Sequence, residues 1–427
     1  MTLLDDSTLV PPKSEERGKR KLDSSELVGH SMKSEGIEHS HLWRRCAIIA
    51  MAISMTTGID ALLAWQVRGP IANGSTDFLA FYTAGQFVSQ GNGIGLFTRS
   101  PFVSAPFTHA PYEALLFVPL AHFSYPVAAW VWCVLNIIIA NLCVFLLLPC
   151  FPRVSKRPEL AFLAVGMFLP VLIAEFNGQD SLLTLLMLVL CFKALSSHKT
   201  ALAGCALACA CFKPPLAIPM LLLIVATSKR PWVFLRGFIA TSCILLLISA
   251  KAVGWGGLVQ YFRFLRAYAA GPDQYHVYDM PNLRGFITWL FASHIGETIL
   301  QGALATLSFF ALILVIWIVR REDLEFQSQH YALFVTATIL VAFHEYSYDL
   351  VLLVLPILII WNSAGSQSSR GNRWMRLAPL VLIIGSVAAS LKPPIYTCAI
   401  VLLFVLLCWT LSTSRLHSRP HQAAVVA

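Results

Sequence analysis

Long apolar stretches recur along this chain from Cys46 almost to its C-terminus, and they constrain its fold more than any other feature. A helix crosses the hydrocarbon of a bilayer, about 30 Å thick, with roughly 20 apolar residues. Backbone groups in lipid must pair within their own element, and these runs of Leu, Ile, Val and Ala lack the alternation of a membrane barrel. With 57% hydrophobic and 12% charged residues, the chain has too little polar surface for a soluble globule. We therefore expect an all-α integral membrane protein.

The apolar runs predict about twelve spans, each bounded by polar or basic residues. The first span is 43–66, and a long connection outside the cytoplasm follows it. The other expected segments are 126–148, 160–175, 181–195, two arms within 201–227, 233–253, 298–319, 331–343, 350–361, 377–390 and 396–411. The two arms are short for a full crossing, so a re-entrant hairpin remains open there. This topology leaves nearly all basic clusters between spans on the cytoplasmic side, as the positive-inside bias requires.

The chain divides into a membrane domain and two tails. Residues 1–42 are polar and basic with almost no apolar periodicity, which predicts a disordered cytoplasmic tail. Since this tail precedes the first apolar run, we expect that run to be a retained span and not a cleaved signal peptide. Residues 43–412 form the polytopic domain, and residues 413–427 form a cytoplasmic C-terminal tail. The formal charge of +9 then reflects topology and gives no evidence for nucleic-acid binding.

Polar residues gather on the side of the membrane opposite to the tails. Four sets lie there in this topology: Asp77 with His109, the run 177–180, the loop 255–282 and the run 344–349. Ionisable groups at membrane depth are costly to desolvate, and several together indicate a substrate cavity more readily than packing. The sequence therefore predicts one functional site on the extracytoplasmic face.

Several short motifs carry a resemblance to a known class of enzymes. The first outer loop contains Thr76-Asp77-Phe78 with Tyr82 and Gly91, then Ala110-Pro111-Tyr112 with Pro119-Leu120-Ala121. This loop resembles that of polyprenol-phosphate-mannose-dependent mannosyltransferases of the GT-C class. Later motifs are similar to those of the bacterial alpha-1,2-mannosyltransferase family: Asn177-Gly178-Gln179-Asp180-Ser181, Ala203-Gly204 with Lys213-Pro214, and His344-Glu345-Tyr346-Ser347-Tyr348-Asp349-Leu350. Together the motifs cover roughly 77–356, most of the membrane domain.

The resemblance implies a GT-C-type fold with its active site on the outer face of a bacterial inner membrane. It implies a polyprenyl-phosphate sugar as donor, with mannose as the hexose, and a glycolipid or glycan as acceptor. The transfer it implies is an inverting single displacement. We expect no cofactor, because a lipid-linked donor needs no nucleotide site, and no metal, because Asp77 lacks a second carboxylate in its own motif.

Asp77 is the candidate general base. An acceptor hydroxyl is a poor nucleophile at neutral pH, so a positioned carboxylate must take its proton as the new bond forms. Ser75, Thr76 and Asp77 also suit the N-cap of a helix over 78–86, so a structural role stays open on the residues alone. His344 is the second catalytic candidate, since it opens the last motif at an outward-facing span end and a donor there would stabilise the leaving phosphate.

The remaining candidates are cations for the donor phosphate and polar groups for the sugar or the acceptor. The phosphate candidates are Lys213, Arg263, Arg266 and Arg284. The sugar or acceptor candidates are His109, Asn177, Gln179, Asp180, Tyr348 and Asp349. Each set has a structural alternative: headgroup contact or snorkelling for the cations, and a turn, a buried histidine or a helix N-terminus for the others.

A transporter or flippase of a lipid-linked sugar is the competing function, because it also needs many spans and a polar cavity. The sequence shows no paired charges placed in mid-span for ion coupling and no obvious repeat of the first half in the second. The 11 cysteines are scattered without metal-ligand spacing, and no Walker or Rossmann motif is present. The residues therefore favour the glycosyltransferase, and turnover by purified protein would distinguish the two functions.

Overall fold

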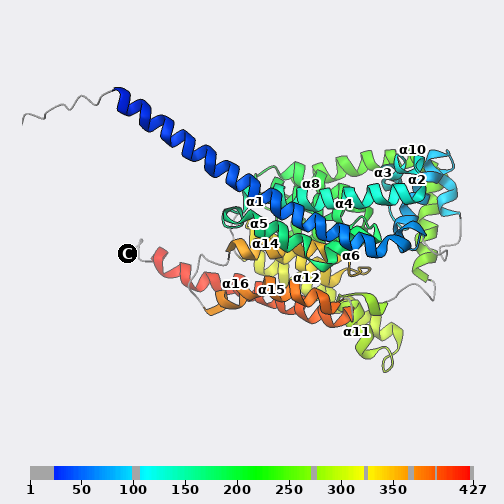
Figure 1. The fold of residues 1–427 in the computed structure, drawn as a ribbon. Helices are drawn as coiled ribbons and strands as arrows, with labels where there is room; N and C mark the ends of the chain where they lie inside the picture. The colour runs from blue at the N-terminus through cyan, green and yellow to red at the C-terminus, as the bar shows by residue number, and fades with distance from the viewer. Residues whose placement is uncertain are drawn as a thin grey trace, which may run out of the picture. The chain divides into compact units, whose positions relative to one another are not determined.

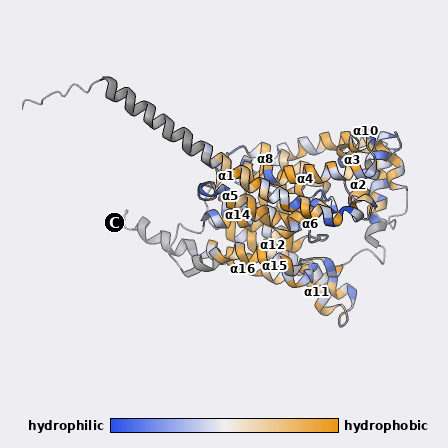
Figure 2. Cartoon of the chain, viewed as in Figure 1, coloured by the Kyte–Doolittle hydropathy of each residue, from blue (hydrophilic) through white to orange (hydrophobic). Residues whose placement is uncertain are grey.

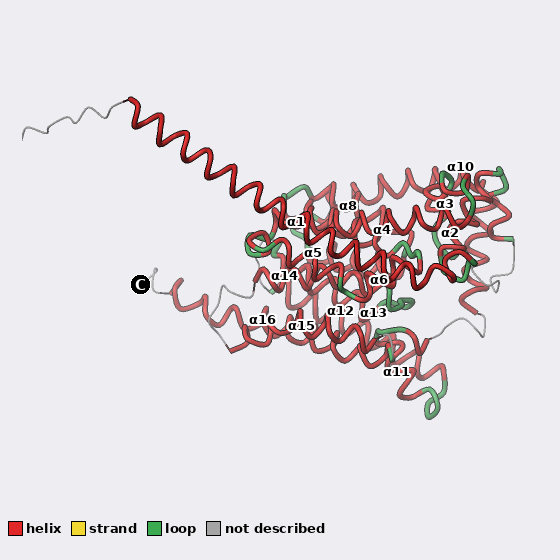
Figure 3. Tube along the Cα trace, in the orientation of Figure 1, coloured by secondary structure: helices red, strands yellow, loops and turns green. Residues whose placement is uncertain are grey.

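The computed structural model is helical throughout the residues that it describes, which are 24–98, 106–270, 277–321, 326–363, 370–389 and 392–423 (Figures 1 and 3). No strand occurs within these ranges. The chain divides into two compact units, Met1–Ala50 and Met51–Ala427, and the helices discussed below belong to the second unit except for the first part of α1. The expected all-α architecture is confirmed.

Most of the described residues lie in α-helices that are joined by short 3₁₀ helices and tight loops. The α-helices are α1 (Ser24–Ala72), α2 (Phe78–Ser89), α3 (Pro111–Phe117), α4 (Tyr125–Leu147), α5 (Pro158–Gly166), α6 (Leu169–Asn177), α7 (Ser181–Ser196), α8 (Thr200–Cys209), α9 (Pro214–Thr227), α10 (Pro231–Ala270), α11 (Leu283–Phe291), α12 (Glu297–Arg320), α13 (Ser328–Val341), α14 (Val354–Ser363), α15 (Arg370–Ala389) and α16 (Pro393–Ala423). The 3₁₀ helices are η1 (Gly93–Phe97), η2 (Leu120–His122), η3 (Leu148–Cys150), η4 (Val154–Lys156), η5 (Ala210–Phe212), η6 (Val277–Asp279) and η7 (Asp349–Leu353).

α4 shows how the sequence pattern produces a membrane helix. Pro126 lies in its first turn, where the missing N–H leaves no helical hydrogen bond unmade. Buried residues such as Ala129, Trp132 and Asn136 recur every three or four positions, and α4 packs against α6 and α7. Large apolar side chains such as Ile138, which is 54% exposed, cover the opposite face. Figure 2 shows apolar residues along the other long helices as well, and such surfaces are stable against lipid.

Helix length separates the expected spans into two groups. Five helices are long and apolar enough to cross a membrane: Cys46–Ala72, Tyr125–Cys150, Pro231–Ala267, Glu297–Arg320 and Pro393–Thr413. The bent pair Pro158–Gly166 and Leu169–Asn177, which meet at 56°, makes a sixth if it is one span. The shorter apolar helices of 10–17 residues are Ser181–Ser196, Thr200–Phe212, Pro214–Thr227, Asp349–Ser363 and Leu377–Val387. By length and composition the described residues thus provide five or six spans, fewer than the expected number of about twelve.

The short helices α13 and α14 form the centre of the second unit. Every residue of α13 from His330 to Leu340 is buried, and so is every residue of α14 from Val354 to Ile360. The two helices pack against each other, and α13 also packs against α9, α12 and α16. A helix that is apolar on all sides belongs in a protein interior. Protein and not lipid therefore covers these segments, which explains why they are apolar without being long.

The two predicted tails differ from the structure where it describes them. α1 begins at Ser24, so residues 24–42 are helical and not disordered as the sequence analysis expects. This part contains no proline and continues directly into the first apolar run, whereas Pro11 and Pro12 lie in residues 1–23, outside the described residues. In the same way α16 extends to Ala423 through most of the predicted tail 413–427, and residues 424–427 are not described.

The long connection after the first span is a small packed layer of helices that leads into the site. α2 packs against α3, η1 and η2. Aromatic rings fill the layer: Phe81 stacks on Phe117 with ring centroids 4.9 Å apart, and Phe78 stacks on Trp132 of α4 at 6.3 Å. α10, which is kinked at Gly254 (φ 73°, ψ 165°), packs against η1 and α3. The packing of this layer fixes the positions of Asp77, which precedes α2, and of His109, which precedes α3.

Candidate active site

Asp77 directly precedes α2, and side chains from a distant part of the chain bind its carboxylate. Oδ2 accepts hydrogen bonds from the Asn177 amide and from the Gln179 amide, the latter at 2.5 Å. The Asp77 backbone N–H donates to Asn177 Oδ1 at 3.3 Å. Although Asp77 occupies the N-cap position of α2, its side chain makes no capping hydrogen bond. The carboxylate is thus oriented by two amides through Oδ2, while the residue is exposed and Oδ1 has no hydrogen-bond partner among the described residues.

The turn between α6 and α7 carries these two amides, and a glycine makes it possible. α6 ends at Asn177, and Gly178 has left-handed backbone angles (φ 69°, ψ 34°), which closes the helix in the usual way. A Cβ on Gly178 would lie only 2.5 Å from Phe78 Cβ, so close packing as well as conformation requires glycine. Trp132 Nε1–H of α4 donates to the Gly178 carbonyl at 2.9 Å. Asn177 and Gln179 consequently project from a turn that is anchored on both sides.

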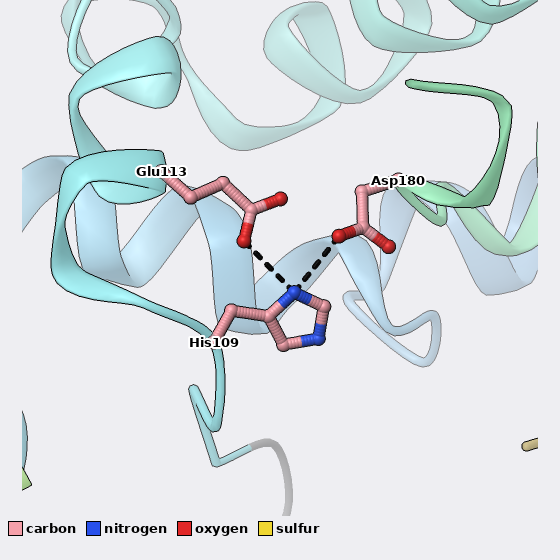
Figure 4. A group of neighbouring side chains, drawn as sticks. All are labelled: His109, Glu113 and Asp180. Atoms are coloured by element: carbon pink, nitrogen blue, oxygen red, sulfur yellow. Dashed lines mark hydrogen bonds and ion pairs between the residues drawn. The ribbon is translucent and has the colours of Figure 1, made fainter. Parts of the chain in front are cut away.

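His109, Glu113 and Asp180 form a second polar group beside this turn (Figure 4). His109 Nδ1 lies 2.8 Å from Glu113 Oε2 and 2.8 Å from Asp180 Oδ2. His109 lies just before α3 and Glu113 lies four positions later in its first turn, whereas Asp180 immediately precedes α7. Both carboxyl groups are fully buried, while 18% of the His109 side chain is exposed. One ring nitrogen therefore faces two buried carboxyl groups.

Lys213 connects Asp180 to the last sequence motif. Its ammonium group lies 2.7 Å from Asp180 Oδ1 and 2.7 Å from Asp349 Oδ1, and it donates to Ser181 Oγ at 2.7 Å. The Ser181 hydroxyl in turn donates to Asp349 Oδ1. The ring of Tyr348 lies 5.3 Å from the ammonium nitrogen. Lys213 thus pairs with two buried carboxylates and donates hydrogen bonds to Ser181 and Asp349.

His344 and Arg284 lie at the next edge of this site. The His344 ring is half-buried and packs edge-on against Tyr346 at 4.9 Å between ring centroids. Arg284 of α11 is buried, donates to the Phe343 carbonyl at 2.8 Å and lies over the Phe343 ring at 3.9 Å. These contacts place a guanidinium group against the residue that precedes His344.

Desolvation and hydrogen bonding act in opposite directions on Asp77. The surrounding protein displaces water from the carboxyl group and raises its pKa. Hydrogen bonds from Gln179 and Asn177, with the positive charges of Lys213 and His109, lower the pKa and offset part of that rise. The net direction is upward, and a raised pKa suits a carboxylate for proton uptake near neutral pH.

The neighbouring groups show the same competition with different outcomes. Burial would raise the pKa of Asp180, but the charges of His109 and Lys213 hold it well below its usual range. Burial and the neighbouring Asp180 raise the pKa of Glu113 to about 8. Burial lowers the pKa of His344 to about 4, so His344 is neutral at pH 7. A neutral imidazole donates one hydrogen bond and brings no positive charge.

Removing the amide that orients Asp77 should change the pH dependence of activity. In Gln179→Leu the Asp77 carboxylate loses a hydrogen bond that favours its ionised form, so its pKa rises further. A general base works only when ionised, and the acidic limb of kcat against pH is therefore expected to move to higher pH. Rate measurements over a pH series test this, with the exposed Gln90→Leu as a matched control. If the acidic limb of Gln179→Leu stays at the wild-type pH, Gln179 does not influence the pKa of the base.

The structure brings most of the predicted site residues into one connected cluster. Hydrogen bonds join Asp77, Asn177 and Gln179, and ion pairs join His109, Asp180, Lys213 and Asp349. The two groups meet where Gln179 and Asp180 follow each other along the chain. Arg263 and Arg266 are exposed on α10, and no ion pair or hydrogen bond joins them to this cluster within the described ranges. Glu113 and Ser181 were not among the site residues predicted from the sequence. The spacing of four between His109 and Glu113 at the start of a helix was the available signal for the first.

The residue types at His109, Glu113 and Asp180 would also suit a metal ion. Their nearest ligand atoms lie within 4.8 Å of one another. However, Nδ1 of His109 already contacts both carboxyl groups, and Lys213 forms an ion pair with Asp180 at 2.7 Å. Ion pairs within the protein therefore account for this group of side chains, and the expectation of metal-independent chemistry stays a prediction.

Comparison with known proteins gives one informative match. No curated protein and no solved structure matches the chain. Residues 107–356 match the model of glycosyltransferase family 87, and this range contains the polar cluster from His109 to Asp349 but begins after Asp77. Since the match covers more than half of the 427 residues, the chain belongs to glycosyltransferase family 87.

Proposed function

We propose that this glycosyltransferase moves a hexose, mannose by resemblance, from a polyprenyl-phosphate donor to a glycolipid or glycan acceptor. The observation that carries the proposal is the carboxylate of Asp77, which is oriented through Oδ2 by Asn177 and Gln179 and exposed. A group held in this way keeps one oxygen for a proton while the amides prevent it from turning away. The family membership supplies the reaction class, and the site supplies the base.

The proposed reaction is an inverting single displacement. The acceptor hydroxyl attacks the anomeric carbon, its proton passes to Asp77 Oδ1, and the bond between that carbon and the phosphate oxygen breaks. The electron pair of this bond leaves with the lipid phosphate, which gains negative charge in the transition state. His344, neutral at pH 7, donates a hydrogen bond to the leaving phosphate, and Arg284 contributes positive charge beside it.

The other phosphate candidates contribute in different ways. Lys213 acts through the network and balances Asp180 and Asp349, because it forms ion pairs with both and donates to Ser181 and Asp349. Arg263 and Arg266 are exposed on α10 and contact the headgroups of the donor or of neighbouring lipids. In the same proposal Tyr348, Asn177 and Gln179 border the sugar.

We further propose the GT-C topology of about twelve crossings, with cytoplasmic termini and the site on the outer face of a bacterial inner membrane. The contacts of Lys213 support it, because they join residues from loops that this topology places on one side. With one crossing fewer between two of these loops, the bilayer would separate their residues by about 30 Å. In this topology the short apolar helices also cross the membrane. They need not match the full thickness of the hydrocarbon, because other helices and not lipid surround them.

One structural feature bears on the flippase alternative. Asp60 of α1 is 4% exposed and Glu175 of α6 is 2% exposed, and both lie in helices that are candidate spans. Their carboxyl groups are close enough to interact electrostatically, and each has an oxygen without a hydrogen-bond partner in the described part of the chain. No such mid-span pair was predicted from the sequence, since the two residues are far apart along the chain. Paired intramembrane carboxyl groups are typical of ion-coupled transport as well as of internal packing.

Turnover in detergent tests the proposal against this alternative. Purified protein is supplied with labelled polyprenyl-phosphate-mannose and membrane-lipid acceptors, and the glycolipid products are separated. We expect transfer without added nucleotide and without a sealed vesicle. Movement of the labelled lipid across sealed proteoliposomes with no product in detergent would favour the flippase and would contradict the proposed reaction.

A further inference from the structure

The His109 imidazole is held by one of its nitrogens and leaves the other available. Nδ1 lies at hydrogen-bond distance, 2.8 Å, from carboxyl oxygens of both Glu113 and Asp180. The Asp180 carboxylate is ionised and can only accept, so the nitrogen that faces it carries the proton. Figure 4 shows that the second ring nitrogen, Nε2, points away from both carboxyl groups. Among the described residues no hydrogen-bond partner of Nε2 is found, and 18% of the side chain is exposed.

Aromatic rings fix the plane of the imidazole. Phe81 meets it edge-on at 5.2 Å between centroids, Phe107 lies at 5.7 Å, and Phe212 is nearly parallel to it at 6.4 Å. These rings provide no polar partner, so a charged or polar ligand is the remaining partner for Nε2–H. The arrangement resembles other carboxylate–histidine pairs, in which one ring nitrogen donates to a carboxylate and the opposite nitrogen binds a ligand or transfers a proton.

The charges around the ring favour its cationic form. Burial disfavours an imidazolium, but the charges of Asp180 and Glu113 outweigh burial and raise the pKa of His109 to about 10. Asp77 and His344 also lie within electrostatic range of His109, and Lys213 shares Asp180 with it. From α10, Tyr261 donates to the carbonyl of Thr108, which precedes the ring, at 3.5 Å. His109 is therefore a fixed positive charge at neutral pH.

We propose that His109 is an anion-binding residue, whose Nε2–H binds the phosphate of the lipid-linked donor while Asp180 and Glu113 hold Nδ1. This inference rests on the proposed function, and it reassigns His109 from the sugar to the phosphate. A charge-assisted hydrogen bond from an imidazolium strengthens as the phosphate gains charge during bond breaking, so it stabilises the transition state more than the bound donor. Glu113 touches no substrate in this proposal and is a positioning residue.

Two variants test the inference through binding and through pH. Polyprenyl phosphate, the product, is the binding probe, and its affinity is measured from ligand-dependent thermal shifts of the full chain. His109→Gln is expected to weaken this affinity about tenfold to a hundredfold, the range that a hydrogen bond to a charged group supports, and to lower kcat with the acceptor KM unchanged. The exposed His122→Gln is the matched control and should bind as the wild type does.

The Glu113→Gln variant gives a readout that a merely structural role would not change. Wild-type activity should fall as the pH rises through the pKa of His109, which is about 10, because the imidazolium is then lost. Without the Glu113 charge that pKa is lower, so the alkaline limb should begin at lower pH in Glu113→Gln. An alkaline limb at the wild-type pH in Glu113→Gln would overturn the inference, and this test remains if His109→Gln does not fold.

The outcomes also separate this inference from the proposed function. A wild type that neither transfers sugar nor binds polyprenyl phosphate would contradict the proposed function itself. If the wild type transfers sugar normally and His109→Gln binds polyprenyl phosphate as tightly as the wild type does, the inference is wrong but the proposed function is not. Loss of wild-type activity with a chelator and its return with a divalent cation would assign the three residues to a metal ion and would likewise overturn it.

Discussion

The variant Asp77→Asn should lose about a hundredfold to ten-thousandfold in kcat, the contribution expected of a positioned general base. The amide has almost the same shape as the carboxylate but does not accept the proton of the acceptor hydroxyl. The Asp77 side chain makes no capping hydrogen bond to α2, so the substitution removes no helix cap. Donor affinity is expected to remain near that of the wild type, because the base contacts the acceptor side of the reaction. Steady-state rates with labelled donor, together with donor binding, measure both effects.

The exposed Asp279→Asn provides a matched control for the loss of one carboxylate outside the cluster, and it should retain wild-type turnover. Normal turnover by Asp77→Asn would reject Asp77 as the base. A large fall in thermal stability of Asp77→Asn would show instead that the amides of Asn177 and Gln179 hold Asp77 chiefly for packing.

The sequence predicts the members of the site better than the contacts among them. Asp77 and the run 177–180 lie about a hundred residues apart, and hydrogen bonds join them. The predicted topology places both after apolar segments that end on the same side of the membrane. That expected topology predicts their common face but not the contacts between them. The choice between helix cap and oriented base depends on a side-chain hydrogen bond, which no sequence pattern determines.

The partners of each charge could not be predicted for the same reason. Lys213 follows an apolar arm and precedes a proline, which indicates the end of a helix but not what the ammonium group touches. The structure places it between Asp180 and Asp349, residues that belong to two other motifs. Glu113 was missed because it lies on the apolar stretch of α3, where only its distance of four residues from His109 distinguishes it.

The number of spans was harder to predict than the fold class. An apolar run has the same hydropathy whether lipid or protein surrounds it in the folded chain. α13 and α14 are apolar and short because neighbouring helices bury them on every side. An apolar run therefore establishes that a segment is buried, and only its length and its neighbours determine whether lipid covers it.

Lys213→Met should be the most destabilising single substitution in the site. Asp180 and Asp349 are buried, and each has a carboxylate oxygen 2.7 Å from the Lys213 ammonium group. Removing one partner of a buried ion pair leaves uncompensated charge and costs about 3–5 kcal/mol. Here one cation serves two carboxylates, so we expect a loss at the upper end of that range. Thermal unfolding of the purified protein in detergent, monitored by intrinsic fluorescence, measures it.

A second substitution determines whether charge or shape causes this loss. In Lys213→Met/Asp349→Asn one of the two stranded carboxylates becomes neutral, so the double variant should be more stable than the sum of the two single changes predicts. The same Lys→Met change at the exposed Lys199 should alter stability by less than about 0.5 kcal/mol. If Lys213→Met unfolds at the wild-type temperature, the ammonium group does not balance these carboxylates, and its donors are then available to the donor phosphate. Thermal unfolding of Lys213→Met therefore distinguishes the two roles. A lower melting temperature is expected if Lys213 balances the carboxylates, and an unchanged one if it binds the donor phosphate.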